Sequence, residues 1–182
     1  MENPAIVQNP DGSTTEHFDI ALAPGRLEKL FRELFEEHWR KIIFGPCIQG
    51  AVFEIHLTEK PKRVAMLDGY LTVDTGPWHF HLCIDEHKQA PTPELARQRQ
   101  ASRAVFFHDI RENGLVKGSW GLRLWNGLGE QMVTIFFPNP YLTDEQKVCK
   151  EPDWSRLVLW EQFRETYSHA SNGTVGNGGG DL

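Results

Sequence analysis

The sequence predicts an α+β fold: a twisted antiparallel sheet of about six strands, with helices on one face and a polar site on the other. Two groups of three segments alternate apolar and polar residues with period two, which is typical of half-buried strands. Amphipathic helical stretches lie before, between and after these groups, in the order α-βββ-α-βββ-α. The order lacks the interleaved βαβ pattern that a parallel sheet needs, so we expect antiparallel pairing.

Three helices are expected. The first runs from about Pro24 to Phe44 and ends at Gly45-Pro46. Thr92 predicts the cap of a short second helix that reaches about Ser102, and a third begins near Pro152. Apolar side chains at spacings of three and four give the first helix a face that needs a sheet to lie on: Leu27, Leu30, Phe31, Leu34, Phe35 and His38.

The six expected strands form two meanders. The first comprises residues 51–57, 63–72 and 78–84, joined by turns short enough for antiparallel hairpins. The second comprises residues 104–110, 119–126 and 131–137, with glycine-containing turns at 113–114 and 127–129. Alternation alone leaves the register between the two meanders open.

The length of 182 residues suits one domain with a sizeable core. Residues 1–15 are rich in turn-forming residues and predict an irregular lead-in. Residues 16–169 form the expected single α+β domain. Residues 170–182 are rich in Gly and Asn and predict a disordered tail.

The charge pattern limits the classes of partner. A formal net charge of -6 opposes binding to phosphate backbones or anionic membranes, so we expect neither nucleic acid nor membrane as a partner. The sequence shows no secretory signal and no apolar run of the roughly 18 residues that span a bilayer, which predicts a cytoplasmic location. Three scattered cysteines favour reduced thiols. The oligomeric state stays open, a homodimer included.

The candidate site lies on the polar faces of two strands in the first meander. Alternate side chains of a strand point to opposite faces, so His79, His81 and Cys83 share one face. The same rule places Glu54 and His56 on the polar side of the neighbouring strand. These five side chains are therefore expected to converge.

Convergence of His, Cys and Glu side chains would bind a divalent transition metal. The predicted ligands are His79 and His81, with His56, Cys83 or Glu54 completing the shell, and zinc, iron, nickel and copper all suit them. We therefore expect a metal-binding protein, with a metal-dependent oxidoreductase, hydrolase or lyase acting on a small molecule as the enzyme class. Three further residues complete the predicted catalytic set: Glu54 and Asp68 to move protons, and Arg123 to hold a substrate carboxylate or phosphate.

The spacing H-x-H-x4-E at His79, His81 and Glu86 resembles the first metal motif of the cupin family. The resemblance covers only these residues. The preceding glycine of the motif is displaced, and no second motif with a later His and Asn follows Gly118. The mixed helix and strand order also differs from the all-β order of cupins. The resemblance implies Glu86 as an alternative ligand to Glu54, without the cupin fold.

Three other functions remain open, one of them a structural or partner-binding role that an acidic surface and an edge strand would serve. The same sheet face could belong to a non-catalytic module that binds haem, another tetrapyrrole or a small apolar ligand, with one axial His. Cys83 could instead be the nucleophile of a metal-free enzyme beside a His base. Aromatic residues fit either a ligand pocket or the core, and the segment Phe137–Tyr141 fits a rigid rim: Trp78, Trp120, Trp125, Phe136 and Phe137.

Overall fold

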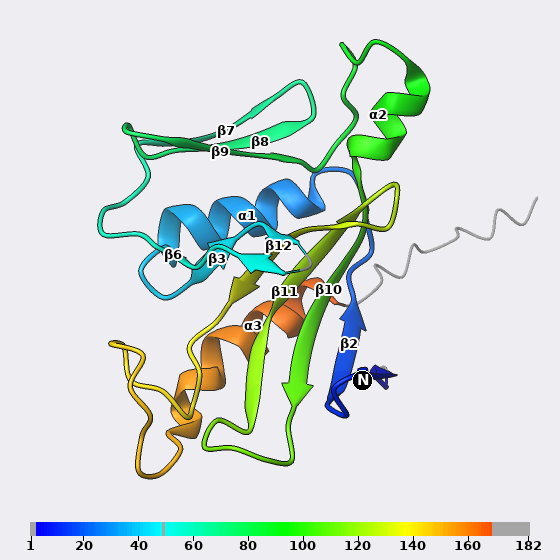
Figure 1. The fold of residues 1–182 in the computed structure, drawn as a ribbon. Coiled ribbons are helices and arrows are strands. Elements are labelled where there is room, and N and C mark those ends of the chain that lie inside the picture. Colours follow the sequence, from blue (N-terminus) through cyan, green and yellow to red (C-terminus); the bar gives the residue numbers. More distant parts are fainter. Residues whose placement is uncertain (1–2, 49, 169–182) are drawn as a thin grey trace, which may run out of the picture.

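The computed structural model describes residues 3–48 and 50–168, so the expected tail at 170–182 lies outside the described residues. Its main element is an antiparallel sheet of seven strands in the order β1-β2-β10-β11-β12-β3-β6 (Figure 1). Their bounds are β1 Ala5–Gln8, β2 Thr14–Asp19, β3 Ile43–Gly45, β6 Ile55–His56, β10 Ala101–Ile110, β11 Gly118–Asn126 and β12 Gln131–Phe136.

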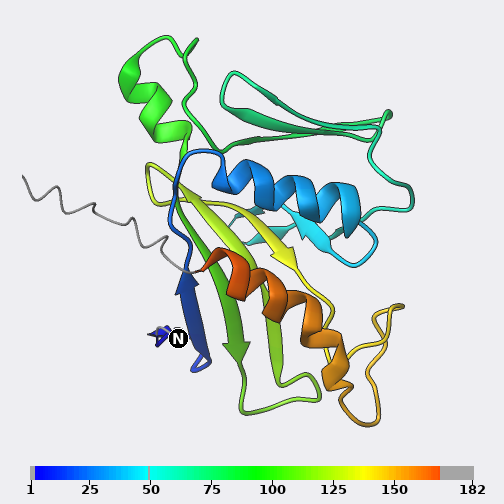
Figure 2. The same cartoon turned by 180° about the vertical axis from the view of Figure 1, so that it is seen from behind.

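Two helices cover one face of this sheet, as the view from behind shows (Figure 2). They are α1 (Arg26–Glu37) and α3 (Val158–Tyr167), which follows a 3-10 turn at Trp154–Leu157. Their buried residues join one hydrophobic core with Phe106, Leu122 and Ile135 of the sheet. The predicted α+β fold with helices on one face of an antiparallel sheet is therefore confirmed.

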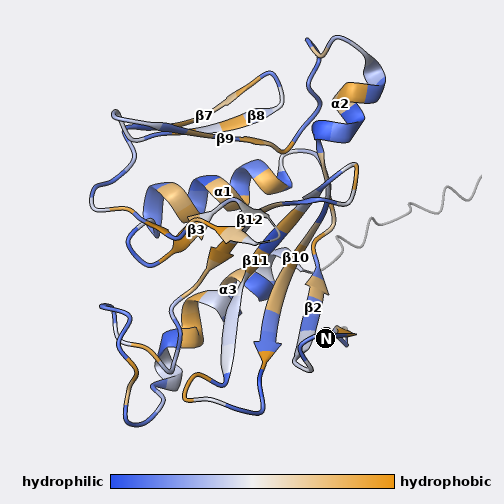
Figure 3. Ribbon diagram, viewed as in Figure 1, coloured by the Kyte–Doolittle hydropathy of each residue, from blue (hydrophilic) through white to orange (hydrophobic). Residues whose placement is uncertain are grey.

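Helix α1 also carries a second layer. Strands β7 (Arg63–Leu67), β8 (Tyr70–Asp74) and β9 (His79–Cys83) form a separate three-stranded sheet that lies over α1 (Figures 1 and 2). Val64, Leu71 and Leu82 of this sheet belong to the same core as α1. The hydropathy colouring shows hydrophobic and hydrophilic stretches alternating along α1, as this amphipathic position requires (Figure 3).

Three expectations about individual elements need correction. The first helix ends at Glu37, and β3 occupies the residues expected to be its last turn. The single strand expected at 51–57 is replaced by two strands of two residues each, β5 (Ala51–Val52) and β6. Strand β5 pairs with β4 (Cys47–Ile48), whereas β6 belongs to the seven-stranded sheet. The lead-in expected to be irregular contains β1 and the start of β2, because Thr15 finds a buried hydrogen-bond partner in the sheet.

The remaining helix is short. Helix α2 (Pro93–Arg99) follows the predicted cap, since Thr92 Oγ1 accepts a hydrogen bond from the Leu95 amide at 3.1 Å. Within the part of the chain that the structure describes, no helix combines the length and apolar character needed to cross a membrane.

Candidate ligand-binding site

The predicted histidine pair lies on the solvent-exposed face of the three-stranded sheet. His79 and His81 are both exposed, with ring centroids 6.0 Å apart. Each ring already has a partner on the neighbouring strand: His79 Nε2 lies 3.1 Å from Asp74 Oδ1, and His81 Nδ1 lies 2.9 Å from Thr72 Oγ1. These contacts are cross-strand pairs at the register positions that face each other.

Cys83 closes the same strand but is only 3% exposed. Its thiol lies 3.5 Å from the Asp85 carbonyl oxygen. Burial raises the pKa of the Cys83 thiol, and the neighbouring Tyr70 hydroxyl opposes this only in part. The raised pKa reduces the thiolate population at neutral pH, which disfavours the nucleophilic role considered for this residue.

The other predicted ligands lie in a different sheet. His56 belongs to β6 at the edge of the seven-stranded sheet, and Glu54 immediately precedes that strand. Among residues 3–48 and 50–168, no group of three or more His, Cys, Asp or Glu side chains could hold a metal ion. The prediction of a bound divalent zinc, iron, nickel or copper ion is therefore wrong, because the strands that carry the histidines separate into two sheets.

Asp68 occupies the turn between β7 and β8 with a positive φ of 46°. Its carboxylate accepts hydrogen bonds from the backbone amides of Lys88 and Gln89 and lies 3.3 Å from His87 Nε2. Those contacts attach the segment after β9 to the β7–β8 turn. The role in proton transfer predicted for Asp68 is not tested by this geometry and stays a prediction.

Arg123 lies on the sheet face opposite the helices. Its guanidinium donates to both carboxylate oxygens of Asp109, with Nη2 to Oδ2 at 2.8 Å and Nη1 to Oδ1 at 3.3 Å. Thr15 and Ser119 hydroxyls donate to the same carboxylate at 2.7 and 3.1 Å. The guanidinium carbon stands 3.7 Å from the ring centroid of Phe107. Arg123 is thus fully engaged in a partly buried polar network.

His17 lies on the same face beside this network and is 7% exposed. Its Nδ1 lies 3.3 Å from Arg103 Nη2, and its ring packs near Trp125 with centroids 6.0 Å apart. Burial lowers the pKa of His17, and the positive charges of Arg103 and Arg123 lower it further. The neutral imidazole is therefore the form that the fold favours.

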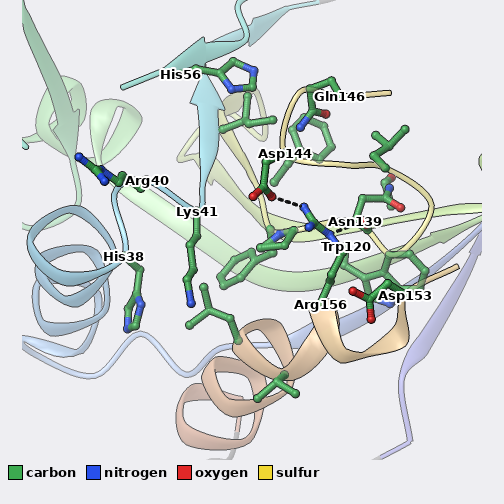
Figure 4. A pocket seen from close by; sticks show the side chains of 18 of the residues that line it. His38, Arg40, Lys41, His56, Trp120, Asn139, Asp144, Gln146, Asp153 and Arg156 are labelled. Atoms are coloured by element: carbon green, nitrogen blue, oxygen red, sulfur yellow. Dashed lines mark hydrogen bonds and ion pairs between the residues drawn. The ribbon is translucent and has the colours of Figure 1, made fainter. Parts of the chain in front are cut away.

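A cavity of about 1000 Å³ lies beside the end of β12, between the segment after α1, the strand β6 and the segment that leads into α3 (Figure 4). Trp120, Phe136 and Phe137 contribute aromatic wall, and Pro138 and Asn139 contribute rim. Of the five aromatic residues considered for a pocket, these three line the cavity and Trp78 and Trp125 do not, while Trp120 and Phe137 also belong to the hydrophobic core. Glu54 and His56 line this cavity as well.

Two histidines line the cavity from different segments. His38 is the C-cap residue of α1, and its backbone amide donates to the Leu34 carbonyl oxygen. Its ring contacts the Phe163 ring edge-on, with centroids 5.5 Å apart. His56 is exposed on β6. Neither imidazole makes a side-chain hydrogen bond to another described residue, which contrasts with the paired rings of His79 and His81.

The cavity is more cationic than the chain as a whole. Four Lys and Arg side chains line it against three Asp and Glu side chains, whereas the whole chain has a net charge of -6. These charged residues are Arg40, Lys41, Arg111, Arg156, Glu54, Asp144 and Asp153. Such a surplus favours anionic ligands over neutral ones.

Most lining residues lie outside the strand patterns from which the site was predicted. His38 fits the apolar periodicity of α1, and Arg40 and Lys41 follow its end. Arg156 belongs to the 3-10 turn before α3. A cluster of basic residues directly after the first helix is the one sequence signal that could have indicated this wall.

Comparisons with known proteins identify a family and a fold. The chain matches, over residues 4–169, the family described as "Family of unknown function (DUF7676)". No curated protein matches it significantly. Its structure is similar to apo-PhuS, a heme-binding protein from Pseudomonas aeruginosa, with a TM-score of 0.52 and 16% identity, covering 83% of this chain and 34% of PhuS. It is also similar to ChuX, with a TM-score of 0.46 and 15% identity, covering 84% of this chain and 78% of ChuX.

At these identities the likeness concerns the fold alone. The chain spans about a third of the length of PhuS, so the likeness covers only part of that protein. PhuS is described as a heme-binding protein, whereas the sequence had predicted a bare divalent metal ion for this chain.

Proposed function

Starting from the membership of this chain in DUF7676, a family described as of unknown function, we propose that it binds haem or another tetrapyrrole in the cavity beside β12. One observation carries the proposal: two imidazoles without side-chain hydrogen bonds to described residues line an aromatic-walled cavity of about 1000 Å³. The small-molecule partner expected from the sequence is then a planar cofactor.

The residues of the cavity fit such a ligand in three respects. Ligand pockets usually enclose about 300–1000 Å³, so this cavity suits a ligand at the large end of that range. Phe136 is its partly exposed aromatic side chain, backed by Trp120 and Phe137, which are 5% and 3% exposed, and this gives a ring system an apolar contact. Its cationic side chains suit peripheral carboxylates.

A bound haem would supply an iron atom, and a neutral imidazole is a common protein ligand for that iron. His56 and His38 are the two candidates in this cavity. His38 is held by the end of α1 and by contact with Phe163, whereas His56 sits on an edge strand two residues long. The likeness to the fold of PhuS supports the same ligand class.

Haem titration tests the proposal. We expect saturable binding with a shifted Soret band in the wild type, and loss of that shift in either His56→Ala or His38→Ala. His79→Ala is the matched control, since it removes an exposed histidine outside the cavity. Titration with iron-free protoporphyrin, followed by tryptophan fluorescence, separates ring binding from iron ligation. Absence of saturable haem binding would refute the proposal, and unchanged spectra in both cavity variants would refute ligation by these histidines.

A further inference from the structure

We infer that the cavity selects a ligand that bears a carboxylate, and that Arg156 is the specificity-determining residue, exchanging Asp144 for the ligand's carboxylate. This inference rests on the function proposed above and deepens it. It distinguishes an anionic tetrapyrrole from the neutral apolar ligands that an aromatic cavity could also accept.

The Arg156 side chain is held in place in the ligand-free protein. Its Nε donates to the Asn139 carbonyl oxygen at 3.1 Å, and its side chain is 20% exposed. Asn139 is itself fixed, since its Nδ2 donates to the Gly118 carbonyl oxygen at 2.8 Å and its Oδ1 accepts from the Tyr141 amide at 2.9 Å. The guanidinium therefore keeps a defined direction at the cavity wall (Figure 4).

The present ion-pair partner of Arg156 is the exposed carboxylate of Asp144. Nη2 donates to Asp144 Oδ1 at 2.7 Å, but the Asp144 side chain is 86% exposed. An ion pair with so exposed a carboxylate contributes little to stability, and the Asp144 carboxylate becomes fully hydrated when the ion pair with Arg156 breaks. A ligand carboxylate at the same position would use the planar fork of Arg156 with less competition from water.

Arg123, which the sequence predicted to hold a substrate carboxylate, is unsuited to such an exchange. Its partner Asp109 has a side chain that is 11% exposed and that also accepts from Thr15 and Ser119. Releasing that carboxylate would leave it unpaired in a poorly hydrated place, which is costly. The role of substrate anchor predicted for Arg123 therefore passes to Arg156 in this proposal.

The wall after α1 carries two further cationic residues. Arg40 and Lys41 follow α1 and line the cavity; in Figure 4 the Lys41 side chain lies across from Arg156, whereas the Arg40 guanidinium points away from it. Neither makes an ion pair with another residue in the described ranges 3–48 and 50–168. The Lys41 ammonium is a point charge that attracts an anion without fixing its direction, and the Arg40 guanidinium lies 4.9 Å from the Trp39 ring centroid, so we assign directional recognition to Arg156.

The test compares haem with haem dimethyl ester, in which both propionates are esterified while the ring and iron are unchanged. We expect the wild type to bind haem about 10- to 100-fold more tightly, the range for hydrogen bonds to charged groups. Arg156→Gln should weaken haem binding by about tenfold and leave the ester within about twofold. Asp144→Asn removes the competing carboxylate and should tighten haem binding by up to about fivefold.

Lys147→Gln is the matched control, because it removes a positive charge from the same segment without lining the cavity. Arg156→Lys keeps the charge without the fork and replaces the glutamine variant if that variant does not fold. Equal wild-type affinity for haem and its ester, or an equal loss of both in Arg156→Gln, would overturn the inference and leave the proposed function standing. Failure of both ligands to bind the wild type would overturn both.

Discussion

The loss of unfolding free energy on disrupting the polar network around Asp109 can be predicted from its distances and exposure. Arg123→Ala removes two hydrogen bonds to the carboxylate and the contact with the Phe107 ring. Breaking a buried ion pair costs about 3–5 kcal/mol. Asp109 keeps its two hydroxyl donors, and the Arg123 side chain is 20% exposed, so we expect a smaller loss of about 2–4 kcal/mol in the free energy of unfolding.

A double-mutant cycle isolates the coupling within this pair. Asp109→Ala should also destabilise the fold, and the double variant should lose less than the sum of the single variants by about 1.5–3 kcal/mol. The reason is that each single variant leaves one charge without its partner, whereas the double variant leaves none. Urea unfolding followed by tryptophan fluorescence measures all four proteins by linear extrapolation.

The exposed pair of Arg103 and Asp19 provides the matched control on the same sheet face. Its Nε to Oδ1 distance is 3.1 Å, but the side chains are 44% and 61% exposed. Disrupting this pair should cost less than about 1 kcal/mol. Additive losses in the Asp109 and Arg123 cycle, within about 0.5 kcal/mol, would refute the reasoning that burial strengthens this pair.

Three further outcomes are expected. Gly121→Ala should destabilise the protein by about 1–3 kcal/mol in urea unfolding, because an added Cβ would lie 2.4 Å from both the Ile135 carbonyl oxygen and Phe107 Cε1. The pKa of His17 is lowered in the fold, so the unfolded chain binds more protons as the pH falls; stability should therefore decline between about pH 7 and pH 5 in the wild type and decline less in His17→Gln. In the native protein, a thiol reagent followed by peptide mass mapping should modify the less buried Cys149 before Cys83.

The elements that could be predicted from the sequence are those whose apolar residues face a core. Helix α1 buries the apolar face that its sequence period predicts, and strands β10 to β12 occupy nearly the residues that their apolar content predicts. Strand β2 does not, because two of its buried side chains, Thr15 and His17, are polar and lie on the sheet face opposite the helices. Thr15 is buried through a hydrogen bond to Asp109, a residue 94 positions away, and local alternation of apolar residues cannot indicate such a partner.

The separation of β7, β8 and β9 from the main sheet could not be predicted for a related reason. Alternation indicates that Leu71 and Leu82 lie on a buried face, and they do. It does not indicate whether a second strand layer or a helix buries them. Helix α1 is apolar enough to pack against both sheets, so the meander lies over the helix instead of joining the larger sheet.

The two kinds of histidine in this chain explain why spacing was a poor guide to the site. In the run from His79 to Cys83, the alternating polar side chains sit opposite Asp74 and Thr72, so the H-x-H pattern satisfies cross-strand pairing on an exposed sheet face. His38 follows the last residue of α1 and His56 lies in a two-residue strand, and neither ring has a side-chain hydrogen-bond partner among the described residues. The histidines to test first are therefore His38 and His56, which line the cavity and lack side-chain hydrogen-bond partners among the described residues.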